Sequence, residues 1–157
     1  MELNELIPAF AAKLEIVGLE ARNGACALEI DGIPLEIVET AGGKALVTSA
    51  IIGRPPLDRP DAFLKLLLEA NTETLGPQGA AFGMLPDTGE VILQWRVTTR
   101  DLELDAFYAE LETFVNQVEQ WRLALENFRP AAEEAASREE EAPIPIMGLG
   151  ASGFISV

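Results

Sequence analysis

The sequence predicts an α+β fold, with one antiparallel sheet of about five strands covered on one face by three helices, in the order α-β-β-β-α-β-β-α. The first observation behind this prediction is an alternation over residues 91–97, where every second side chain is apolar: Val91, Leu93, Trp95 and Val97. Such alternation is typical of a sheet with one buried and one wetter face, because a strand buried on both faces is continuously apolar. The second observation is the long amphipathic helix that follows, whose apolar stripe needs a sheet to cover it.

The first half of the chain predicts a helix and then a three-stranded meander. Apolar residues at three- and four-residue spacings from residue 3 to residue 14 predict the helix, which should end near Gly18. Alternation over residues 25–30, the turn Asp31-Gly32 and a second run to residue 38 predict a β-hairpin. A glycine turn at residues 41–43 then leads into a third strand over residues 44–52.

The second half predicts a helix, two more strands and a last helix. Pro60 marks the first turn of the middle helix, which carries more apolar surface than one core-facing stripe requires. This excess fits a helix buried on both sides as well as it fits a subunit interface. Strands over residues 80–85 and 91–99, and a helix from about residue 104 to 127, complete the predicted fold.

Composition divides the chain into a folded domain, residues 1–128, and a tail, residues 129–157. A chain of 157 residues is long enough to bury a core without a disulfide or a metal. The tail is first acidic and then rich in Pro and Gly, which predicts a mobile segment. Its apolar end, residues 144–157, leads to the hypothesis that it lies in the client groove of its own or of a neighbouring dimer when no client is bound. A tail without any function is the plainer alternative.

Charge and cysteine content narrow the class of protein. The net charge of −15, from 26 acidic against 11 basic residues, disfavours nucleic-acid binding, and no local basic patch offsets it. No apolar run is long enough to cross a membrane, and the N-terminus lacks the basic start of a signal peptide. The single cysteine, Cys26, fits a reducing compartment. We therefore expect a soluble, cytoplasmic protein without membrane insertion.

The sequence is poor in chemically active residues. Without any histidine it cannot build a Ser-His-Asp or Cys-His arrangement, and one cysteine cannot build a zinc site. The segment Gly42-Gly43-Lys44-Ala45 lacks the upstream glycine and the hydroxyl residue of a phosphate-binding loop. We expect no catalytic residues, no metal and no cofactor, and therefore not an enzyme.

The order of elements, taken with several short motifs, resembles a known family. The motifs are Ala70-Asn71, Leu75-Gly76-Pro77, the Leu85–Leu93 turn, and Phe114, Val115 and Trp121 in the last helix. Together they resemble the class I chaperones of bacterial type III secretion, the Tir-chaperone-like (CesT-type) family. The resemblance covers residues 1–128, and the longer C-terminal extension departs from the family pattern. It implies a homodimer that binds the N-terminal segment of a secreted effector in extended form, without ATP or metal, and keeps it export-competent.

The resemblance also implies two surfaces. The client groove would involve the first helix and the first strands: Leu3, Leu6, Phe10, Leu28, Ile30, Leu35 and Ile37. The dimer interface would involve the middle helix and a later strand: Phe63, Leu64, Leu67, Leu68, Val91, Leu93 and Trp95. Ordinary core is the alternative for each residue. Two other functions remain open, an adaptor or regulatory dimer for a folded partner protein and a protein that holds a small hydrophobic ligand.

Overall fold

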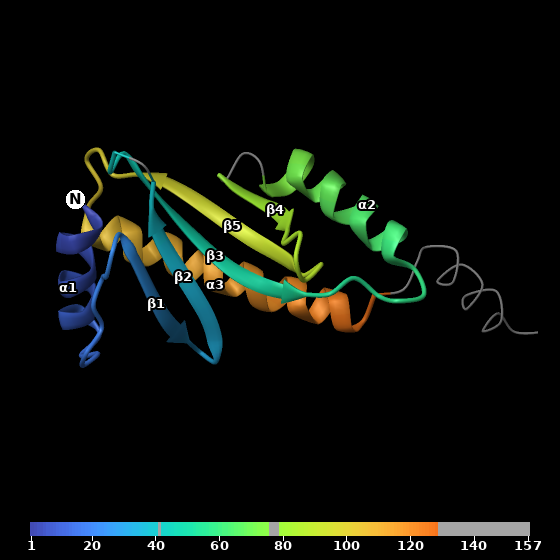
Figure 1. Ribbon diagram of the computed structural model, residues 1–157, viewed down its shortest axis with the longest axis horizontal. Coiled ribbons are helices and arrows are strands. Elements are labelled where there is room, and N and C mark those ends of the chain that lie inside the picture. Colours follow the sequence, from blue (N-terminus) through green and yellow to red (C-terminus); the bar gives the residue numbers. More distant parts are fainter. Residues whose placement is uncertain (41, 76–78, 129–157) are drawn as a thin grey trace, which may run out of the picture.

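The computed structural model describes residues 1–40, 42–75 and 79–128 (Figure 1). Within these residues the elements follow one another as α1 (Leu3–Lys13), β1 (Ala25–Ile30), β2 (Ile33–Glu39), β3 (Ala45–Gly53), α2 (Pro60–Ala70), the π-helical segment η1 (Asn71–Leu75), β4 (Ala80–Met84), β5 (Val91–Thr98) and α3 (Leu104–Glu126). The predicted order is confirmed, and each strand boundary lies within one residue of its prediction. The predicted tail lies outside the described residues.

The first helix ends earlier than the sequence predicts. It stops at Lys13 rather than near Gly18. Glu15 adopts a left-handed conformation with a φ of 56°, and the Ile16 N–H donates to the Ala11 carbonyl at 2.9 Å. This arrangement satisfies the last carbonyls of a helix and usually has glycine at the left-handed position. Glutamate takes that position here, so the end of the helix leaves no glycine signal.

The five strands form one antiparallel sheet in the order β1-β2-β3-β5-β4. Across its middle, Ile37, Thr48 and Trp95 are direct neighbours in successive strands, and all three are buried. Residues at alternate positions point to the opposite face, where Val38 and Arg96 are exposed. Helix α3 runs along the buried face (Figure 1). The two-faced sheet predicted from the alternation in residues 91–97 is therefore confirmed.

Aromatic contacts hold the helices on the buried face. The Phe10 ring of α1 meets Phe107 of α3 edge-on, with ring centroids 5.9 Å apart, and Trp95 of β5 stacks on Phe107 at 5.8 Å. At the other end of α3, Phe63 of α2 meets Phe128 edge-on at 5.1 Å. Each such pair contributes about 0.5–1.5 kcal/mol beyond the burial of its area. These contacts dock α1 and α2 at opposite ends of α3.

Candidate protein-binding surfaces

The sheet face that points away from α3 carries an apolar hollow of about 440 Å³, which we name the outer-face hollow. Ile51 and Ile92 are cross-strand neighbours on its floor, and the Gln94 side chain donates to the Ser49 hydroxyl at 3.1 Å. No residue of the described helices lines it, and Glu36 is its one ionisable side chain. Its complete lining is Ala27, Pro34, Leu35, Glu36, Ser49, Ala50, Ile51, Leu85, Ile92 and Gln94. Such a largely uncharged surface suits apolar side chains.

One edge of the sheet is open. Strand β1 has β2 on one side, and on its other side the described residues pair only with its first residue, Ala25, which bonds to Arg22. The Glu39 N–H donates to the Gly24 carbonyl at 2.8 Å, and backbone groups alternate in direction along an antiparallel strand. Ala27 and Glu29 therefore turn their backbone N–H and C=O groups away from β2. An unpaired edge of this kind is a template for an additional strand.

The opposite edge is blocked at its middle. The side-chain amide of Asn71 accepts from the Phe82 N–H at 2.6 Å and donates to the Phe82 carbonyl at 3.3 Å. Both groups lie on the side of β4 that faces away from β5, because Arg96 of β5 bonds to the carbonyl of Gly79, three residues before Phe82. Asn71 thus takes the place of a neighbouring strand, so β4 is less available than β1 for strand addition.

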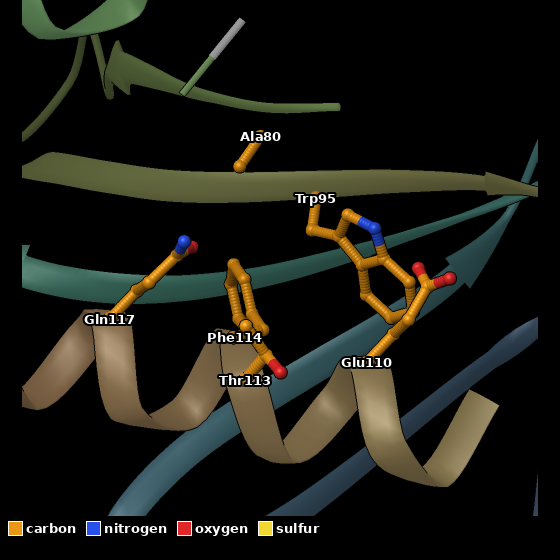
Figure 2. Close-up of a pocket in the computed structure, with 6 residues that line it drawn as sticks. All are labelled: Ala80, Trp95, Glu110, Thr113, Phe114 and Gln117. Atoms are coloured by element: carbon orange, nitrogen blue, oxygen red, sulfur yellow. The ribbon is translucent and has the colours of Figure 1, made fainter. Parts of the chain in front are cut away.

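Two smaller hollows border α3 on its own face of the sheet. The first, about 360 Å³, lies between α3 and the strands β4 and β5, where the Trp95 and Phe114 rings lie close to Glu110 and Gln117 (Figure 2). The second, about 270 Å³, lies between α1, the β1–β2 turn and α3. It is lined by Phe10, Leu14, Ile30, Asp31, Tyr108, Leu111, Glu112, Val115 and Asn116.

The structure places most residues of the predicted client groove in the core. Five are buried, namely Leu3, Leu6, Phe10, Leu35 and Ile37, and they hold α1 and β2 against the rest of the core. Leu28 and Ile30 are half-buried, and Ile30 borders the hollow beside α1. Contact of a client with any of these seven side chains remains a prediction. Leu35 is the one residue of the seven that also lines the outer-face hollow, and the other lining residues were not predicted, among them the short side chains Ala27 and Ser49, which give no hydrophobic signal.

The residues of the predicted dimer surface likewise divide into buried core residues and accessible ones. Phe63, Leu67, Val91, Leu93 and Trp95 are buried within the chain. Leu64 is half-buried, and Leu68 is 67% exposed one helical turn further along α2. Three further exposed apolar residues lie before α2, in β4 and near the end of α3, namely Leu57, Met84 and Leu123. The accessible part of this surface is therefore the outer side of α2, and its role in dimerisation remains a prediction.

The described residues offer little for chemistry. Burial raises the pKa of the Cys26 thiol above its ordinary value of 9.0, which favours the unreactive protonated form. Within residues 1–40, 42–75 and 79–128, no three His, Cys, Asp or Glu side chains are grouped closely enough to hold a metal ion. No helix in the same ranges has the length and apolar character needed to cross a membrane.

A family model matches most of this chain. It describes the Tir chaperone protein (CesT) family, and the match extends over residues 5–122, from α1 to the last turns of α3. No curated protein matches the chain.

Solved structures share the fold. A chain of the ExsC–ExsE complex is 22% identical with a TM-score of 0.67, and the match covers 80% of this chain and 97% of that one. A chain of the HopA1–SchA chaperone–effector complex is 20% identical with a TM-score of 0.65, covering 76% and 92%. A chain of the complex between the Yersinia pestis type III secretion chaperone SycH and a stable fragment of YscM2 is 18% identical with a TM-score of 0.61, covering 75% and 98%. At these identities the likeness shows the fold.

Proposed function

This chain belongs to the Tir chaperone protein (CesT) family of type III secretion chaperones, and we propose that it binds the N-terminal segment of a secreted effector in extended form. Two copies of the chain form the working unit. The bound segment stays unfolded and ready for export from the bacterial cytoplasm. Binding draws on backbone hydrogen bonds and apolar contacts, so neither ATP nor another cofactor takes part.

One observation carries the proposal, namely that the open edge of β1 and the outer-face hollow share Ala27. The Ala27 side chain lines the hollow, while its backbone groups face the open side of β1. An extended segment added beside β1 would therefore satisfy its own backbone along the edge and bring alternate side chains to the rim of the hollow. Backbone pairing and apolar anchoring carry little sequence code, which suits a chaperone for a non-globular client.

The exposed side of α2 supports the homodimer. Leu64 and Leu68 are one turn apart on the same side of the helix, and Lys65 pairs with Glu69 beside them at 3.8 Å. An apolar strip with charged residues at its border is the usual composition of a subunit interface. The charge of −15 repels other copies at longer range, so only a matched contact of this kind overcomes it.

Co-expression with the N-terminal segment of an effector from the same bacterium tests the proposal. Light scattering on the purified complex should give the mass of two chaperone chains and one segment, equally with and without ATP. The segment should show no cooperative unfolding transition of its own. The proposal is wrong if the chain does not bind the N-terminal segment and binds a folded domain of the effector, as an adaptor protein would.

A further inference from the structure

The outer-face hollow is unusual for a chain of this charge. Of its ten lining residues one is ionisable, whereas acidic and basic residues make up 24% of the whole sequence. Ile51, which lines the hollow, is 43% exposed. Apolar surface left open to water costs free energy in proportion to its area, so a covering segment would be stabilised there.

A matching segment exists in the same chain. Residues 143–157 contain no acidic and no basic side chain, although five glutamates lie between residues 133 and 141. Seven of these fifteen residues are large and apolar, namely Ile144, Ile146, Met147, Leu149, Phe154, Ile155 and Val157. The segment lies outside the described residues, and like the hollow it is largely apolar and uncharged.

The last turns of α3 contact β3 at Ile51, a residue that also lines the hollow on the other face of the sheet. The Arg122 guanidinium donates to the Ile51 carbonyl from Nε at 3.0 Å and from Nη2 at 2.8 Å. The last turns of α3, from which residues 129–157 continue, therefore lie behind the sheet at Ile51, one of the residues that line the hollow, and the segment would pass around the sheet to reach it. Residues 129–142 span up to about 46 Å when fully extended, so their length does not limit the reach of the segment. A tethered segment also has an effective concentration on the order of millimolar.

We propose that residues 143–157 occupy the outer-face hollow of their own chain when no client is bound, and that a client must displace them. This inference rests on the proposed function, because it concerns the regulation of the same binding surface. The tail then shields the apolar hollow in the free chaperone and raises the affinity that a client needs.

Disulfide trapping in the full chain tests the position of the tail. Two variants are made in a Cys26→Ala background. The first carries Ser152→Cys with Ser49→Cys, which lies in the hollow. The second carries Ser152→Cys with Thr113→Cys, which lies on α3. The Ser49 pair should form an intramolecular disulfide at least tenfold faster. Equal rates, a faster Thr113 pair or a product of twice the mass would overturn the proposal.

A peptide competition tests the same point without new cysteines. A synthetic peptide of residues 143–157 is titrated into two full-length variants that each gain two charges. Ile146→Asp with Phe154→Asp removes two apolar anchors, whereas Ser152→Asp with Ser156→Asp keeps them. The peptide should bind the first variant at least tenfold more tightly, because its hollow is vacated. Equal affinities would overturn the proposal.

An effector segment in the same titration separates this inference from the proposed function. If the two variants bind the effector segment equally and the trap fails, the inference is wrong while the chaperone function stands. If the trap succeeds and no effector segment displaces the tail, the chaperone function is wrong while the tail contact stands.

Discussion

The side-chain amide of Asn71 bonds to both backbone groups of Phe82, accepting at 2.6 Å and donating at 3.3 Å. Replacing this amide by the carboxylate of an aspartate would turn an oxygen toward the Phe82 carbonyl in place of a donor. We therefore expect Asn71→Asp to lower the free energy of unfolding by about 1–3 kcal/mol. Urea denaturation measures this loss.

Thr72→Ala is the matched control for Asn71. The Thr72 hydroxyl donates to the Leu68 carbonyl in the preceding helix α2 and not to a strand. Its removal should change the free energy of unfolding by less than about 0.5 kcal/mol. Equal losses in the two variants would contradict the role of Asn71 at the edge of β4.

Gly53 at the end of β3 should be intolerant of a side chain. Its φ of 147° is unfavourable for other residues, and a Cβ atom there would lie 2.6 Å from Leu125 Cδ2. Gly53→Ala should destabilise the protein by about 1–3 kcal/mol, measured by thermal unfolding. Gly18→Ala is the control, since Gly18 has a φ of 81° with no atom near its Cβ position. A larger loss at Gly18 would show that the contact with Leu125 is unimportant.

Leu68 on α2 should be required for self-association. It is 67% exposed in the single chain, so the Leu68→Asp variant should fold normally. Light scattering should nevertheless give the mass of a monomer for this variant. Val17→Asp adds the same charge at a residue that is 97% exposed in the loop after α1. It should leave the dimer intact. If the Leu68→Asp protein remains dimeric, the dimer interface does not lie on α2.

The N–H of Ala27 should matter for client binding and little for stability. Proline is tolerated on an edge strand where the N–H faces away from the sheet, as it does here. Ala27→Pro should weaken binding of an effector segment at least tenfold, about 1.4 kcal/mol, in a calorimetric titration. Ala27→Ser keeps the N–H with a side chain of similar size and should bind nearly normally. If both variants bind alike, the client does not pair with β1.

Ionisation of the Cys26 thiol should lower the free energy of unfolding at alkaline pH. Burial raises the pKa of its thiol above 9.0 in the folded protein, so the unfolded chain loses its proton first as pH rises. The contribution of the buried protonated thiol to the free energy of unfolding is complete below pH 9.0. It is lost between that pH and the higher pKa of the folded protein. Urea unfolding at pH 8 and pH 10 should show a steeper loss in the native protein than in Cys26→Ala. Parallel pH profiles would contradict this prediction.

The strands could be predicted from the sequence almost to the residue, because an alternation of period two is a local signal. The end of α1 could not, since Glu15 takes the left-handed position that normally carries glycine. The role of Asn71 depends on its closeness to Phe82, eleven residues away, which no local pattern reveals.

Exposure was the hardest property to predict. The apolar spacing of Leu3, Leu6 and Phe10 correctly identifies the side of α1 that is covered. It does not reveal whether the chain itself or a client covers that side, and in the structure these residues are part of the core. Conversely, Ser49 and Ala27 line the outer-face hollow although neither is conspicuously apolar.

Hydrogen exchange of the chaperone with and without an effector N-terminal segment tests the central claim most directly. The account predicts that binding slows exchange at the amides of Ala27 and Glu29 on the open edge of β1. The amide of Phe82, already bonded to Asn71, should be unchanged. Tight binding of the segment with no added protection along β1 would contradict the account.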